Sequence, residues 1–228
     1  MQRTMIGMMW CAVGTVGLAQ AAAADALTGL YVGGNYGAAR NEYQTSFVDD
    51  QYQQAAMSAG DSLDITTTSV RRSGDTWWVD AGYMPWVYVG FDAAFFHLPE
   101  LTHRTSGTLQ TAIGGEPIVT TATVTSRGPA VSLVARVPLT DWLELGMRVG
   151  DYFGKTTLTT GLELNSTYSA SPQSASKSSL LVGIGGAYTF AGHWSLRLDY
   201  LRFDHAGDSR TVGTFSMNMA TAGVAFTF

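Results

Sequence analysis

Hydrophobic and polar residues alternate along several segments of this chain. In residues 86–98, for example, Val89 and Phe91 fall on one face while Gly90 and Asp92 fall on the other. An alternation with a period of two predicts a β-strand that has one apolar face and one polar face. Eight such segments follow one another, at 27–40, 75–84, 86–98, 124–138, 142–158, 178–190, 194–205 and 213–228.

The connections between the predicted strands are alternately short and long. The short ones are tight turns at Pro85, 139–141 and 191–193, and the long ones are 41–73, 99–123, 159–177 and 206–212. Within the second long connection, the threonine-rich residues 102–126 alternate enough to predict a hairpin that continues beyond the barrel. Tight turns at one end and long loops at the other are typical of outer-membrane barrels.

The two faces of the strands distinguish a membrane barrel from its rival, a soluble periplasmic β-protein. In the fifth segment, Leu145 and Met147 alternate with Gly146 and Arg148. Small residues suit the crowded interior of a narrow barrel, while the apolar face meets lipid. Because lipid-exposed backbone must be paired, a membrane chain without long apolar helices has to close its sheet. We therefore predict an all-β fold, an eight-stranded antiparallel up-and-down transmembrane β-barrel.

Tryptophan residues support the same interpretation. Five of them lie at or near the ends of predicted strands, at Trp77, Trp78, Trp86, Trp142 and Trp194. Tryptophan concentrates at both membrane–water interfaces. We predict that a membrane girdle includes Trp77, Trp86, Trp142 and Trp194. In a soluble protein these side chains would instead pack a core.

The first 24 residues have the order of a secretory signal peptide. Arg3 precedes a short apolar stretch, and Ala22-Ala23-Ala24 provides a cleavage site. The alternative, a retained helical anchor, needs about 20 apolar residues, which this stretch lacks. We predict a signal peptide at 1–24 and a barrel domain at 25–228. Cys11, the sole cysteine, falls in the signal, so disulfides and thiolate metal sites are excluded from the mature chain.

Charge excludes one class of partner. Removing residues 1–24 removes Arg3 and no acidic residue, so the net charge of −5 becomes −6. A mildly acidic chain without a basic cluster argues against nucleic acid as a partner. His97 and His103 flank Glu100, a weak metal constellation that we interpret as the polar ends of a hairpin. No metal site and no cofactor are predicted.

Seven charged residues fall on the polar faces that point into the predicted lumen. They are Asp80, Asp92, Arg136, Glu144, Arg148, Arg197 and Asp199. An eight-stranded barrel has room for side chains but not for a wide channel. Buried charges are tolerated when paired, so we predict a network across the lumen. The network could simply fill the interior, or it could act as a gate for water or small ions.

Short motifs resemble OmpA-like and opacity-protein barrels. Residues 194–204 resemble their seventh strand, Tyr31-Val32-Gly33-Gly34 is similar to their opening strand, and the last strand ends in Phe228. The resemblance implies a bacterial outer-membrane location and a C-terminal assembly signal formed by Val224, Phe226 and Phe228. It implies outer-membrane lipid, lipopolysaccharide and the barrel-insertion machinery as partners. The chain ends where the OmpA protein continues, so we expect the transmembrane domain without a peptidoglycan-binding domain.

Enzymatic function finds little support in the sequence. Small barrels that deacylate lipid A use a histidine and a serine near the outer rim, and His205 lies in a comparable strand. Residues 206–209, Ala-Gly-Asp-Ser, lack the serine two positions after the histidine. The long loops are the natural place for binding. We therefore predict a non-enzymatic protein with a structural or surface-interaction role, the alternatives being a narrow porin-like channel or, less favoured, a lipid-modifying enzyme.

Overall fold

A computed structural model describes residues 28–43, 46–58, 60–112, 114–164, 167–190, 192–207 and 214–228. The signal peptide predicted at 1–24 lies outside these residues. Among them, no helix is long and apolar enough to cross a membrane. The described elements are β1 (Gly29–Tyr43), α1 (Ser46–Ser58), β2 (Ser62–Arg71), β3 (Ser73–Met84), β4 (Val89–His97), β5 (Leu101–Thr111), β6 (Gly114–Pro138), β7 (Leu143–Leu164), β8 (Thr167–Thr189), β9 (Trp194–Ala206) and β10 (Phe215–Thr227).

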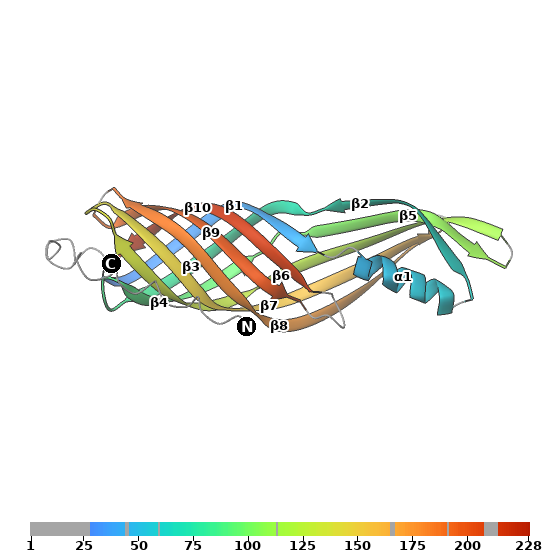
Figure 1. Cartoon of the computed structure of the whole chain (residues 1–228), viewed down its shortest axis with the longest axis horizontal. Coiled ribbons are helices and arrows are strands. Elements are labelled where there is room, and N and C mark those ends of the chain that lie inside the picture. The colour runs from blue at the N-terminus through green and yellow to red at the C-terminus, as the bar shows by residue number, and fades with distance from the viewer. Residues whose placement is uncertain are drawn as a thin grey trace, which may run out of the picture.

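Eight of the described strands close a ring (Figure 1). Their order is β1-β3-β4-β6-β7-β8-β9-β10, and β1 pairs with both β3 and β10, which leaves the ring without an edge. Every neighbouring pair is antiparallel. The predicted eight-stranded antiparallel barrel is confirmed.

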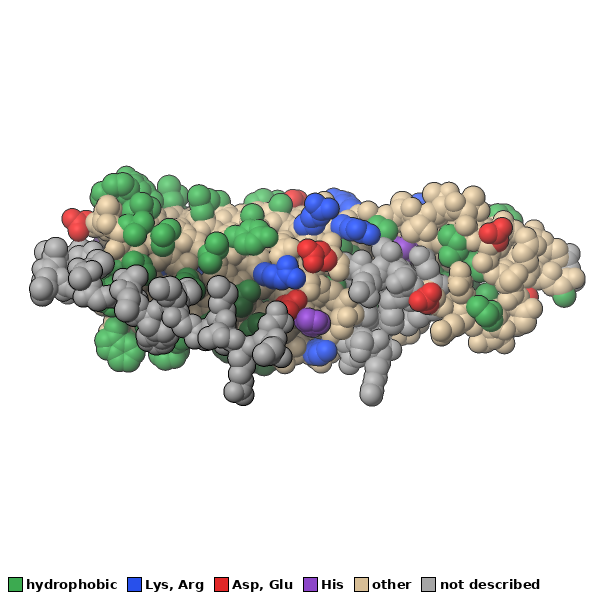
Figure 2. All heavy atoms as spheres, viewed as in Figure 1, with side chains coloured by type: hydrophobic (Ala, Val, Ile, Leu, Met, Phe, Trp, Pro, Cys, Tyr) green, Lys and Arg blue, Asp and Glu red, His purple; other side chains and the backbone are tan. Residues whose placement is uncertain are grey.

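The outward face of the ring is apolar. Phe91, Met147 and Leu198 are 57%, 65% and 68% exposed, whereas Asp92 and Arg148 are buried inside. Hydrophobic side chains cover the barrel end of the molecule in Figure 2 and thin out toward the other end. A soluble β-sandwich would turn these faces inward, so their exposure favours a surface that meets lipid.

Three strands are far longer than a bilayer requires. β6, β7 and β8 contain 25, 22 and 23 residues, whereas a tilted strand crosses a membrane with about 9–11. Beyond the ring, β6 leaves β4 and pairs with β5, which in turn pairs with β2. Within the described residues, β2, β5 and the far halves of β6–β8 thus form a five-stranded sheet, here called the extension (Figure 1).

The extension corrects part of the sequence interpretation. The long connections predicted at 41–73, 99–123 and 159–177 consist largely of α1, β2, β5 and the ends of β6–β8. Only the hairpin within 102–126 was predicted to extend, and β5 paired with β6 confirms it. The polar Ser/Thr composition that suggests loops is also compatible with strands whose backbone groups pair with neighbours while their side chains meet water.

Candidate functional site

The seven charged residues predicted for the lumen lie inside the ring. They come from five strands: Asp80 from β3, Asp92 from β4, Arg136 from β6, Glu144 and Arg148 from β7, and Arg197 and Asp199 from β9. We call these residues the charge layer. Each has an oppositely charged partner within the layer.

Asp80 and Asp92 form the centre of the charge layer. Arg197 Nη1 donates to Asp80 Oδ2 at 2.7 Å, and Arg148 Nη1 lies 3.3 Å from Asp92 Oδ1. Arg148 Nη2 also approaches Asp80 Oδ2 at 3.9 Å. Tyr31 Oη donates to Asp92 Oδ2 at 2.9 Å, which gives this carboxylate a neutral partner as well. Such pairing offsets the cost of removing these charges from water.

Two further pairs complete the layer, and the Arg136–Glu144 pair is the nearer to a tight turn. Arg136 Nη1 lies 3.3 Å from Glu144 Oε1, and Arg197 Nε lies 3.6 Å from Asp199 Oδ2. These groups line a cavity of about 40 Å³. That volume holds about three water molecules.

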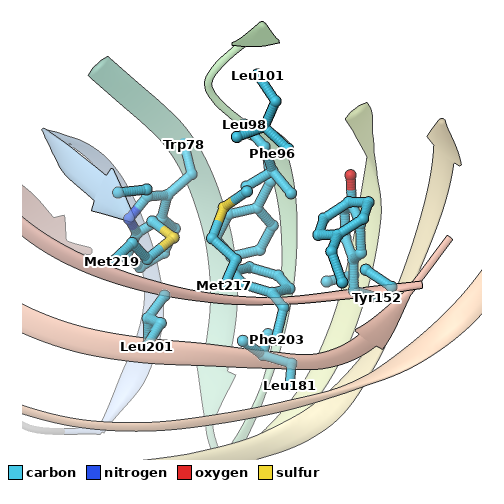
Figure 3. Packing of buried hydrophobic residues seen from close by; sticks show 14 of the residues in the cluster. Trp78, Phe96, Leu98, Leu101, Tyr152, Leu181, Leu201, Phe203, Met217 and Met219 are labelled. Carbon is cyan, nitrogen blue, oxygen red and sulfur yellow. The ribbon is translucent and has the colours of Figure 1, made fainter. Parts of the chain in front are cut away.

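A second layer, which the sequence analysis missed, fills the other half of the lumen (Figure 3). At its centre lie Trp78, Phe96, Tyr152 and Phe203, all 0–1% exposed. Phe203 meets Phe96 and Tyr152 edge-on, with ring centroids 5.1 Å apart in both pairs. We call this cluster the apolar layer. Its side chains pack together inside this part of the lumen.

Trp78 lies inside the ring, which corrects its predicted place at or near a strand end. Its position beside Trp77 suggested a strand end, but β3 continues past it to Ser73, and alternation turns its ring inward. The indole Nε1 donates to Thr221 Oγ1 of β10 at 3.2 Å, past the intervening strand β1. Strand parity could have identified this position, because Trp78 lies two residues from the inward Asp80.

The four tryptophans predicted for the girdle point outward. Trp86, Trp142 and Trp194 are 64%, 50% and 46% exposed beside the tight turns. Trp77 is 41% exposed toward the extension and stacks on His97 at 5.4 Å. The outward apolar surface of the ring, here called the apolar belt, therefore has three exposed tryptophans at its tight-turn end and Trp77 at the end toward the extension.

The histidines do not gather into a site. His97 is exposed on the outer face, whereas His103 is buried and lies 2.9 Å from Thr105 Oγ1. In the described part of the chain, no group of three or more His, Cys, Asp or Glu side chains could hold a metal ion.

His205 lies on the rim of the barrel. It is exposed, with Nδ1 3.1 Å from Asp204 Oδ2, while Ser209 lies outside the described residues. A hydrogen bond from Ser216, together with His205 and Arg202, lowers the pKa of the Asp204 carboxyl group, which lies beyond the apolar belt.

The C-terminal residues pack against the last tight turn and the first strand. The Phe226 ring lies 5.1 Å from that of Phe228 and 5.0 Å from that of Trp194. The backbone N–H of Phe228 donates to the carbonyl oxygen of Leu30 at 2.9 Å. Val224 and Phe228 are exposed, 43% and 68%.

The extension contains a cavity of about 380 Å³ beneath α1. Its wall combines apolar side chains with hydroxyl groups and one acidic residue, Asp61. The lining includes Tyr52, Leu63, Leu109, Ile118, Leu162, Thr160 and Ser171. Figure 1 shows α1 running beside the extension, beyond the end of the ring. A concave, mostly apolar surface with a few polar groups has the character of a small-molecule site.

Comparison with known proteins identifies the family. The family model of the outer membrane protein β-barrel domain matches residues 9–228. The chain belongs to this family. The OmpA-like assignment and the bacterial outer-membrane location predicted from the sequence are confirmed. In outer-membrane barrels the short turns face the periplasm and the long connections face outside the cell, and we expect the same orientation for the tight turns and the extension.

Solved structures of other outer-membrane barrels are similar in fold to this family member. The attachment invasion locus protein Ail of Yersinia pestis, in complex with the heparin analogue sucrose octasulfate, is 11% identical (TM-score 0.48; 88% of this chain and 99% of Ail covered). OprG of Pseudomonas aeruginosa is 12% identical (TM-score 0.46; 88% and 96% covered). Neisserial surface protein A is 12% identical (TM-score 0.45; 88% and 98% covered). No match was found among curated proteins.

Proposed function

We propose that this protein is a closed outer-membrane scaffold whose extracellular extension binds a ligand. One contrast carries the proposal: the lumen is filled by the apolar layer, whereas the extension holds a cavity of about 380 Å³. A binding site therefore has room outside the membrane and little within it. Loops and rims carried by a rigid barrel are the usual place for binding.

The lining of the cavity indicates the class of ligand. Leu109, Ile118 and Leu162 supply apolar contacts, and the hydroxyl groups of Thr160 and Ser171 can orient a polar end. Pockets of about 300–1,000 Å³ bind small organic molecules. The ligand we propose is a small apolar molecule, or the apolar group of a larger one, with a single polar end.

The narrow channel receives less support. Passage would require Trp78, Phe96, Tyr152 and Phe203 to leave positions in which they are 0–1% exposed. Large buried aromatic side chains contribute strongly to packing, and opening them to water is costly. The charge layer is consequently proposed to fill and stabilise the lumen.

Methyl NMR of the refolded chain in lipid nanodiscs tests the cavity, with indole as the probe. We expect the methyl signal of Ile118, which lines the cavity, to shift and saturate as indole is added. Ile184 is 62% exposed on the lipid-facing surface and serves as an internal control whose shift should not saturate. A Thr160→Trp variant, which fills the cavity, should abolish the saturable shift. An Ile118 signal that never saturates, or one unchanged by Thr160→Trp, would overturn the proposal.

A further inference from the structure

A hollow of about 670 Å³ opens on the outer surface where the barrel meets the extension. Its apolar floor crosses three strands in one register: Ala38 of β1 lies opposite Ala220 of β10, which lies opposite Tyr200 of β9. Ala38 and Ala220 are exposed and short, while the neighbouring Tyr36 and Leu198 are 59% and 68% exposed. The two alanines therefore leave a depression between large outward side chains.

Cations border the same hollow on the side of the extension. Arg40 follows Ala38 two residues later on the outward face of β1, and Arg72 lies beside it between β2 and β3. The backbone of Asn41 donates to the carbonyl oxygen of Arg72 at 2.8 Å, which fixes the two segments together. Both arginines are exposed, and neither forms an ion pair with a carboxylate of the described residues.

The acidic residue of the hollow already has partners. Glu42 Oε2 lies 3.8 Å from Arg202 Nη2, and Glu42 Oε1 accepts a hydrogen bond from Asn218 Nδ2 at 3.2 Å. Arg202 lies next along the register, opposite Asn218. Arg202 Nη2 also lies 3.7 Å from Asp204 Oδ1, so it offsets the charge of Glu42 in part. Arg40 and Arg72 have no carboxylate partner among the described residues, and their positive charges are available to a ligand.

The position of the hollow, at the border between the lipid-facing surface and the extension, indicates the class of ligand. The hollow has an apolar floor on the lipid side and arginines on the side of the extension, which is the polarity of a lipid at the outer membrane surface. Figure 2 shows Lys and Arg side chains, interspersed with Asp and Glu, between the hydrophobic barrel and the extension on the face in view. Arginine binds phosphate through paired hydrogen bonds. We propose that the hollow binds a phosphorylated glycolipid of the outer leaflet, with phosphate on Arg40 and Arg72 and an acyl chain along Ala38 and Ala220.

Binding of purified diphosphorylated lipid A tests this site. The full mature chain, refolded in dodecyl maltoside, is titrated and the bound lipid counted by native mass spectrometry. We expect saturable binding to the wild type and a loss of roughly tenfold or more in affinity for Arg40→Gln/Arg72→Gln, because two charge-assisted contacts are removed. Dephosphorylated lipid A should bind as weakly to the wild type as diphosphorylated lipid A binds to the variant, and millimolar inorganic phosphate should not displace the lipid.

Arg127→Gln/Lys155→Gln is the matched control. These two cations are exposed and lie directly opposite each other on β6 and β7, but they do not line the hollow. The control removes the same charge and should keep nearly full affinity. An equal loss of affinity in both double variants would mean that the lipid is held by nonspecific charge attraction, and would overturn the proposed site. So would undiminished binding to Arg40→Gln/Arg72→Gln, equal binding of dephosphorylated lipid A, or displacement by inorganic phosphate. The heat-dependent shift in gel mobility verifies that each variant is folded.

Discussion

The guanidinium carbon of Arg148 lies 4.5 Å from the centre of the Trp78 ring, where the charge layer meets the apolar layer. Arg197 approaches the same ring at 5.1 Å. A cation over an indole face is attracted by about 0.5–2 kcal/mol, more when water is excluded. Trp78 therefore packs within the apolar layer on one side and stabilises two buried cations on the other.

Loss of Arg148 should destabilise the barrel strongly. In Arg148→Ala, Asp92 loses its cation while it stays buried, so we expect the free energy of unfolding to fall by about 3–5 kcal/mol. Urea unfolding in lipid vesicles measures the change. Arg136→Ala provides the comparison, because its pair with Glu144 lies nearer water, with side chains 14% and 11% exposed. That variant should lose less, and an equal loss in both would contradict the distinction between centre and edge.

The apolar layer should prevent ion conductance through the barrel even when the charge layer is altered. In planar bilayers we expect no discrete conductance from the wild type or from Arg148→Ala, because Phe96 and Phe203 still occupy the lumen. A triple variant, Trp78→Ala/Phe96→Ala/Phe203→Ala, should conduct. Discrete currents from Arg148→Ala alone would instead identify the charge layer as a gate and restore the channel hypothesis.

Fluorescence quenching should separate the inward tryptophan from the outward ones. In variants that keep a single tryptophan, brominated lipids should quench Trp77, Trp86, Trp142 and Trp194. Trp78 should be protected because it is 0% exposed inside the ring. Bromine placed near the headgroups should be the most effective, since the outward rings lie at the interfaces. Strong quenching of Trp78 would show that the Trp78 side chain points toward lipid and not into the lumen.

Deletion of Phe228 should impair assembly more than stability. The side chain is 68% exposed, so we expect the unfolding free energy of the refolded protein to change by less than about 1 kcal/mol. The amount inserted into the outer membrane of living cells should fall several-fold if the residue belongs to the predicted assembly signal. Leu139→Ala, at a tight turn where the side chain is 50% exposed, is the control and should insert normally. Normal insertion of the deletion would exclude Phe228 from that signal.

Local alternation determined much of this protein. Because side chains of a strand point to opposite faces in turn, Met147 outward and Arg148 inward follow from sequence spacing alone. The same rule gives the inward facing of Asp80 and Asp92. The barrel and the membership of the charge layer could therefore be predicted. The pairs of Arg197 with Asp80 and of Arg148 with Asp92 could not, because each joins side chains of strands that are not neighbours in the ring.

Tertiary structure alone decided the apolar layer, the extension and the hollow. Phe203 packs against Phe96 only after β9 and β4 close into one ring, and no local pattern specifies that contact. The same holds where β6 changes partner from β4 to β5, because strand pairing is a relation between distant segments. The sequence by itself thus determined which side chains face lipid and which face the lumen, whereas closure of the ring decided which of them meet.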